Sequence, residues 1–133
     1  MKKTLITLIL IALSVIAVVY YIMNKPHKDI NNETTINITA VQLFNEFTTN
    51  ESAANAKYLN KALEVNGIII VVAENQDNEQ YIVLKTNDEM YGIMCTLRHK
   101  NINSFVGDNV NIKGYCSGFA GDVKLTDCVL TNK

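Results

Sequence analysis

The chain opens with a long apolar segment. Residues 4–23 contain no charged side chain and follow Lys2 and Lys3. Twenty helical residues at 1.5 Å each reach roughly 30 Å, the thickness of the hydrocarbon layer of a membrane. We therefore expect residues 1–23 to form a single membrane-spanning signal anchor that enters the membrane through residues 4–23. The alternative is a signal peptide cleaved after Ala17, which would leave an apolar stretch, residues 18–23, on the mature chain.

The segment that follows is polar. Residues 24–38 contain the only proline, Pro26, and show no amphipathic period, so we expect a flexible linker with a reach of roughly 20 Å. Lys2 and Lys3 oppose Lys25 and Lys28 across the apolar run, so the distribution of positive charge barely sets the orientation. Because a three-residue head is easily retained in the cytosol, we expect the rest of the chain outside the cytoplasmic membrane.

Helical spacing begins at Thr39. Thr39 followed by Gln42 is typical of a capping box, and Phe44 and Phe47 continue an apolar stripe over about two turns. A second helical stretch follows over residues 50–58, where Asn50 can cap the first turn. Both patterns predict a short helical lead-in to the region that follows.

From residue 63 onward the apolar positions alternate with a period of two, which indicates strands. The expected strands cover residues 63–72, 81–85, 91–97, 110–114 and 123–130. Residues 98–105 leave room for one or two helical turns, with Ile102 and Phe105 closing one end of a barrel, and residues 117–122 form a loop. Three strands, a short helix and two strands is the order of an OB-fold, so residues 39–133 are predicted to be a mainly β domain, a five-stranded Greek-key barrel.

Several segments resemble one known family, the bacterial tRNA_anti-like OB-fold proteins. The resemblance covers about residues 39–130, and the segments that carry it are residues 43–44, 50–56, 58–67, 107–114, 116–119 and 122–128. Members of this family are short proteins that are exported or attached to a membrane and have no established activity. The resemblance therefore implies the fold and the location and says little about the ligand.

Composition and charge narrow the function. The chain has 133 residues, 48% hydrophobic and 19% charged, which excludes a multidomain enzyme and a disordered tail. The net charge is -1, but all acidic residues lie in residues 29–133, where they outnumber the basic ones by five. An acidic barrel repels polyanions, so nucleic acid is not the expected partner.

OB barrels usually bind ligands on the face of their second and third strands. Here that face would use Tyr81, Tyr91, Thr96, Arg98 and Phe119. The aromatic rings could stack on bases, but the acidic loop at residues 74–79 and the turn at residues 88–89 place negative charge beside them.

Cys116 and Cys128 are on consecutive strands joined by a short loop, so we expect a disulfide between them, worth roughly 3 kcal/mol on the chain-entropy model. The alternative is three buried reduced thiols, with Cys95 on the third strand. No Cys-x-x-Cys spacing is present, so we expect no metal site from the cysteines and His99.

The sequence contains no phosphate-binding loop, no glycine elbow around a serine and no His-rich metal motif. We therefore expect no cofactor and no enzymatic activity. The prediction is a single-pass protein of the cytoplasmic (inner) membrane whose extracytoplasmic domain binds an unknown protein or small ligand. The alternative is a barrel face that binds single-stranded nucleic acid or an oligosaccharide.

Overall fold

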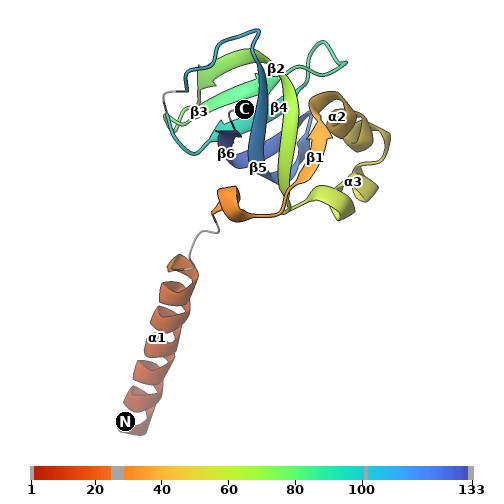
Figure 1. The fold of residues 1–133 in the computed structure, drawn as a ribbon. Coiled ribbons are helices and arrows are strands. Elements are labelled where there is room, and N and C mark those ends of the chain that lie inside the picture. The colour runs from red at the N-terminus through yellow and green to blue at the C-terminus, as the bar shows by residue number, and fades with distance from the viewer. Residues whose placement is uncertain (1, 25–28, 101, 132–133) are drawn as a thin grey trace.

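The fold was obtained as a computed structural model, and it describes residues 2–24, 29–100 and 102–131. The first element is helix α1 (Lys2–Met23), which lies outside the barrel in Figure 1. None of the segment Ile6–Met23 is buried. This helix is long and apolar enough to cross a membrane, as many signal sequences at this end of a chain also are.

Five strands close the predicted barrel. They are β2 (Ala62–Glu74), β3 (Gln80–Leu84), β4 (Ile93–Leu97), β5 (Asn109–Ala120) and β6 (Asp122–Thr131). The strand order β2-β3-β4-β6-β5 returns to β2, with β4 and β6 parallel and the other neighbours antiparallel. The prediction of a mainly β, five-stranded OB-fold barrel with an N-terminal helical lead-in is confirmed.

Alternation along each strand fills the barrel. Ile82 and Leu84 on β3 and Ile93 on β4 are fully buried, as are Val65 on β2 and Leu125 on β6. The residues between them point outward, because successive side chains of a strand face opposite sides of the sheet. Each strand therefore contributes one row of side chains to the core and one row to the surface.

Two short helices cover one end of the barrel (Figure 1). They are α2 (Ala40–Thr49) and α3 (Glu51–Tyr58). Both expected caps form: the Gln42 amide donates to Thr39 Oγ1 at 3.2 Å, and the Ala53 amide donates to Asn50 Oδ1 at 3.0 Å. Phe47 is buried, as the apolar stripe predicts.

Part of the expected linker belongs to the domain. Residues 25–28, with Pro26, lie outside the described residues. From Asp29 onward the chain is part of the domain, with a 3₁₀ turn η1 (Ile30–Asn32) and a strand β1 (Ile36–Thr39) that pairs in parallel with β2. The Ile30 side chain is fully buried, so it fastens this segment to the barrel by burial of apolar surface.

Two further expectations are wrong. The described residues between β4 and β5 contain no helix, and Phe105 is 74% exposed instead of closing the barrel. The buried phenylalanines of α2, Phe44 and Phe47, belong to the core instead. The expected loop at residues 117–122 is also shorter, because β5 continues to Ala120 and turns at Gly121, whose φ of +83° suits glycine.

Candidate binding site on the barrel face

The outer face of β3, β4 and β6 forms a continuous strip. Tyr81 lies opposite Thr96, and Val83 lies opposite Met94. Met94 is in turn next to Lys124 on β6. These side chains are partly or fully exposed, because the intervening residues of each strand occupy the core. The strip thus offers apolar, aromatic and hydroxyl groups and one lysine to a ligand.

A hollow of about 550 Å³ extends this strip toward β5. Its lining includes Glu79, Thr96, Arg98, Tyr115, Thr126 and Asp127. The register explains the grouping, because Tyr115 on β5 lies opposite Thr126 on β6. A concave site of this size with a few polar groups fits a small molecule or a single side chain.

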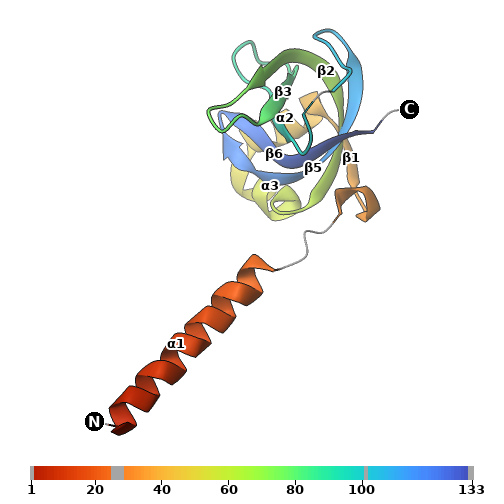
Figure 2. The same ribbon diagram turned by 90° about the vertical axis from the view of Figure 1, so that its left-hand side faces the viewer.

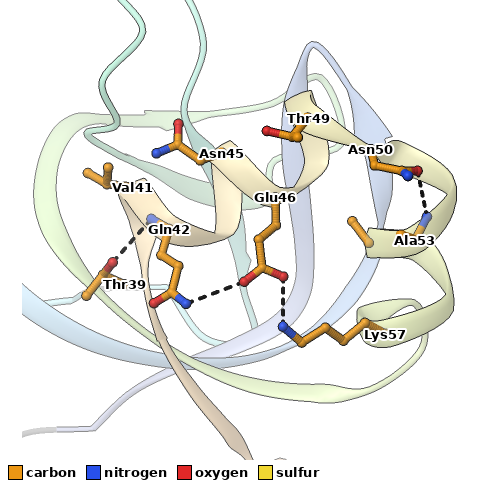
Figure 3. A pocket seen from close by; sticks show the side chains of 10 residues that line it. Thr39, Val41, Gln42, Asn45, Glu46, Thr49, Asn50, Ala53 and Lys57 are labelled. Carbon is orange, nitrogen blue, oxygen red and sulfur yellow. Dashed lines mark hydrogen bonds and ion pairs between the residues drawn. The ribbon is translucent and has the colours of Figure 1, made fainter.

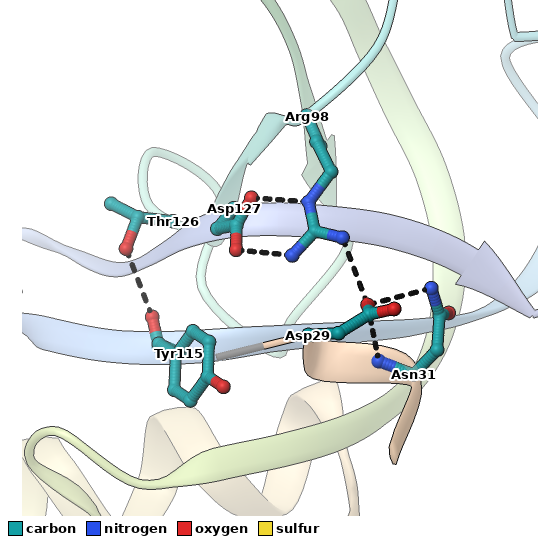
Figure 4. Close-up of polar contacts among 6 residues, drawn as sticks. All are labelled: Asp29, Asn31, Arg98, Tyr115, Thr126 and Asp127. Atoms are coloured by element: carbon teal, nitrogen blue, oxygen red, sulfur yellow. Dashed lines mark hydrogen bonds and ion pairs between the residues drawn. The ribbon is translucent and has the colours of Figure 1, made fainter. Parts of the chain in front are cut away.

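Arg98 is held by two carboxylates beside this hollow (Figure 4). Its Nε donates to Asp127 Oδ1 at 2.6 Å and its Nη2 to Asp127 Oδ2 at 2.5 Å, a two-pronged pairing. Its Nη1 donates to Asp29 Oδ1 at 3.0 Å. We call these three residues the Arg98 clamp. It joins the end of β4, strand β6 and the segment that leads back to α1.

A bulge positions one carboxylate of the clamp. The register between β4 and β6 shifts between Cys95 and Leu97, and Asp127 has a φ of +56°. An extra residue in one strand bends it locally and redirects a side chain. The Asp127 carboxylate consequently lies beside Arg98 on the outer face rather than following the regular alternation.

The contacts of the clamp shift the pKa values of Asp29 and Arg98. The backbone amide of Asn31 and then the Arg98 guanidinium hold the pKa of Asp29 below its usual value. The carboxylates of Asp127 and Asp29 raise the pKa of Arg98, which is therefore always charged. Desolvation first, and nearby carboxylates second, raise the pKa of Tyr115. The hollow has Glu79 and Asp127 on its lining and Asp29 beside Arg98. Its surroundings therefore carry more negative than positive charge.

Three of the five predicted site residues meet at this face. Tyr81 and Thr96 are cross-strand neighbours, and Thr96 and Arg98 line the same hollow. Tyr91 lies elsewhere: a Cβ atom placed on Gly121 would stand 2.7 Å from the Tyr91 ring, so the ring covers the turn between β5 and β6. The ring is 44% exposed, which leaves one side open to solvent.

Phe119 is not on the predicted face. Its ring stacks on Phe47 with centroids 5.7 Å apart and meets Phe44 edge-on at 6.2 Å. It is therefore a packing residue between β5 and α2. The sequence could not distinguish these roles, because an aromatic residue beside a turn suits both of them.

Sequence reasoning missed Asp29, Tyr115 and Asp127. Asp29 fell in the expected linker, and Asp127 reaches Arg98 only because of a bulge that no local pattern announces. Tyr115 had a usable signal, since it alternates with buried Gly114 and Cys116 and so faces outward.

A sequence profile matches nearly the whole chain, over residues 1–130, and its family is described as tRNA_anti-like. The chain belongs to the tRNA_anti-like family. The resemblance predicted from the sequence is thereby confirmed. No curated protein matches this sequence.

Two solved structures are similar to this tRNA_anti-like barrel. A lipoprotein from Klebsiella pneumoniae subsp. pneumoniae, suggested to bind nucleic acid, matches with a TM-score of 0.58 at 17% identity, over 81% of this chain and 100% of its own. At that identity the match shows the fold alone. The yeast Stn1 and Ten1 structure has a TM-score of 0.47 at 11% identity, over 75% of this chain and 64% of that chain.

The three cysteines of this tRNA_anti-like chain are free and buried, and the structure does not show the expected disulfide between Cys116 and Cys128. Cys116 lies opposite Leu125, and the bulge places Cys128 beside Leu97. The Cys128 thiol instead contacts that of Cys95 on β4, and burial raises its pKa well above the usual value. Among the described residues, no three His, Cys, Asp or Glu side chains are grouped as metal ligands would be.

A second hollow, of about 520 Å³, lies between α2 and α3 (Figure 3). Glu46 occupies its centre, and its Oε2 accepts hydrogen bonds from Lys57 Nζ and from the Tyr58 hydroxyl, each at 2.8 Å. The hydrogen bond from Lys57, followed by that from Tyr58, lowers the pKa of Glu46. These contacts join the two helices, so the charges at the centre of this hollow serve the packing of the lead-in.

Proposed function

We propose that the protein is a membrane-anchored, extracytoplasmic binding module without catalytic activity. Its ligand is a small polar molecule or a polypeptide side chain. It is bound in the hollow lined by Arg98 and Thr126 and on the adjoining strip of β3, β4 and β6. The apolar helix α1 supports the anchor, and the concave, partly polar hollow supports binding.

The observation that carries this proposal is the state of Arg98. It is the only arginine in the chain, and its Nε, Nη1 and Nη2 groups all donate to the carboxylates of Asp127 and Asp29. A phosphate group would have to displace Asp127 or Asp29 and would meet Glu79 on the same lining. The hollow therefore favours an uncharged or cationic ligand over a polyanion.

The Thr126 hydroxyl of the hollow supports binding without catalysis. Thr126 Oγ1 donates to the backbone carbonyl of Tyr115 at 3.5 Å rather than to a general base. The two carboxylates of the clamp are paired with Arg98. These groups can orient a ligand, whereas nucleophilic attack needs a hydroxyl activated by a base.

A second candidate is binding of single-stranded nucleic acid or an oligosaccharide. It is favoured by Tyr81 and Tyr91, whose partly exposed rings could stack on bases or sugars, and by Lys124 on the same strip. The Klebsiella lipoprotein of the same fold has been suggested to bind nucleic acid. Against it stands the acidic surrounding of the hollow.

The two candidates can be separated with the full chain in nanodiscs. The probes are a fluorescent Gly-Lys repeat octapeptide, its Gly-Glu twin, a fifteen-residue oligothymidine and chitotetraose. We expect the lysine peptide to bind at least tenfold more tightly than the acidic twin, and oligothymidine not to bind at physiological salt. The variant Thr126→Arg should abolish peptide binding, and Ser52→Arg on the exposed side of α3 should leave it unchanged.

Tight, salt-sensitive binding of oligothymidine that Thr126→Arg strengthens would instead establish the second candidate, and so would chitotetraose binding that is lost in Tyr81→Ala. Indifference to all four probes would refute both. The location is tested separately with a carboxy-terminal alkaline phosphatase fusion, which is active only when the domain is exported.

A further inference from the structure

Strand β2 has an open backbone edge over its second half. Its pairing with β5 ends at Ile68 opposite Asn109. Two more backbone bonds follow: the Ile69 amide donates to Asp108 O at 2.9 Å, and the Gly107 amide donates to Ile69 O at 2.8 Å. Beyond Ile69, the described part of the chain supplies β3 on one side of β2 and no strand on the other.

The turn before β5 explains why the ladder stops. The Phe105 amide donates to Asp108 Oδ2 at 2.8 Å, and the Asp108 amide donates to Phe105 O at 3.1 Å. Both backbone polar groups of Phe105 are therefore used within the turn. The chain leaves β2 at this point and cannot continue the sheet.

Apolar side chains surround this open edge. A bulge between Ile69 and Val71 breaks the alternation, so the consecutive residues Ile70 and Val71 are 41% and 37% exposed. In the adjoining turn, Phe105 and Val106 are 74% and 64% exposed. An unpaired strand edge with exposed apolar neighbours is a template for another strand.

We propose that this surface, which we call the β2 edge (residues 70–74 with Phe105 and Val106), binds an extended polypeptide segment of a partner protein as an added strand. Backbone donors and acceptors along an edge are matched by an extended peptide, while pockets between side chains select apolar residues at alternate positions. Four apolar side chains are too few for the roughly 800 Å² that each subunit of a stable dimer contributes. A short segment fits this area.

The position of the β2 edge agrees with a partner in solution. Figures 1 and 2 both show the loop that leads into β5 at the end of the barrel away from η1. The chain leaves for α1 from the η1 end, where Asp29 is held by Arg98. The β2 edge is consequently accessible while the opposite end is tied to the segment that leads to α1.

The test uses the full chain in nanodiscs. Random nine-residue peptides displayed on phage are selected on the protein after depletion on empty nanodiscs, and a recovered peptide is synthesised with each backbone amide N-methylated in turn. We expect methylation at alternate amides to weaken binding more than tenfold and methylation at the amides between them to change it less than twofold. Hydrogen exchange at residues 70–74 should be faster than at residues 62–68 in the free chain and should slow when the peptide binds.

Two substitutions at residues of similar exposure test whether peptide binding depends on the β2 edge. Ile70→Asp should weaken peptide binding more than tenfold, whereas Leu59→Asp, at a residue of similar exposure on the loop before β2, should leave it unchanged. Recovery of no peptide, insensitivity to N-methylation, or equal weakening by both variants would overturn the proposal. Slow exchange at residues 70–74 in the free chain would mean that the edge is already covered. If that protection grows with protein concentration alone, the occupant is a second copy of this chain and not a partner peptide.

Discussion

The first and second halves of β2 form one continuous strand in different surroundings. Residues 62–68 pair with β5 on one side, residues 63–66 also pair with β1 on the other, and inward-facing Leu63 and Val65 are fully buried. Outward-facing Glu64 accepts a hydrogen bond from Thr131 at 3.2 Å. Residues 69–74 have β3 as their only strand neighbour among the described residues, and Ile70 is exposed.

The difference arises from the neighbours, because the run of β-branched residues at 68–72 crosses the boundary between the halves without a change in composition. Propensity makes both halves strand-like. Only the path of β5 and the turn at Asp108 decide which half is closed. We therefore expect partner access to depend on the second half, and stability to depend on the buried positions of the strand.

The largest effect should come from the closed half. Leu63→Ala removes a fully buried side chain and leaves a cavity, so it should lower the free energy of unfolding by about 3 kcal/mol. Ile70→Ala, at an exposed position of the same strand, should change it by less than about 0.5 kcal/mol. Guanidinium unfolding of the full chain in detergent micelles, followed by tyrosine fluorescence, measures both. Equal losses would show that the burial of Leu63 and the exposure of Ile70 do not decide their contributions to stability.

The partner of Leu63 across the sheet gives the next effect. Gly114 lies opposite Leu63, and a Cβ atom there would stand 2.5 Å from Cys128 Sγ and 3.2 Å from the Thr126 carbonyl oxygen. Gly114→Ala should therefore cost about 1–3 kcal/mol through overpacking. Cys128→Ala in the same chain removes the sulfur and should recover part of that cost. Strict additivity of the two substitutions, measured by the same unfolding experiment, would contradict this account.

The Arg98 clamp should have a smaller and more local effect. Arg98→Met leaves Asp127 without its two-pronged partner and should cost about 1 kcal/mol, since the pair is only partly exposed. Hydrogen exchange should accelerate in residues 30–39, which the clamp holds through Asp29, and stay unchanged in residues 70–74. Lys100→Met, at an exposed neighbour, is the control. Acceleration throughout the barrel would mean that the clamp supports the whole fold.

The strands, both helix caps and the order of the barrel could be predicted from the sequence, because they depend on local spacing. The alternation of Leu63, Val65 and Gly67 and the Thr39–Gln42 spacing need no distant contact to be read. Strand β1 had a weak signal, since Ile36 and Ile38 alternate with polar residues, but four residues are too few to separate a strand from a linker.

The candidate site depended on tertiary structure and was only partly predictable. Tyr81 and Thr96 follow from strand register, whereas the pairing of Arg98 with Asp29 joins residues 69 positions apart. The bulge before Cys128 places this residue opposite Leu97 and brings the Asp127 side chain to Arg98. A single extra residue in a strand leaves no periodic signal, and its effects appear only once two strands are paired.

The smallest effect concerns acid stability at the η1 end of the barrel. The Asn31 amide and then Arg98 hold the pKa of Asp29 below its usual value of about 4 in the unfolded chain. The stabilisation of the fold by the ionised Asp29 carboxylate is therefore present above pH 4. It is lost as the pH falls through the lower pKa that Asp29 has in the folded chain.

Asp29→Asn removes the titration, so its melting temperature should fall less than that of the native chain between pH 4 and pH 2. The change is small because the Asp29 side chain is 51% exposed and solvent screens the pair. Glu46→Gln, at the other carboxylate whose pKa is lowered, should reduce the acid sensitivity in the same direction. In both variants hydrogen exchange at residues 70–74 should stay as fast as in the native chain, because neither carboxylate contacts the β2 edge. A steeper loss of melting temperature in Asp29→Asn would show that this carboxylate opposes folding and that burial of Ile30 alone holds the segment.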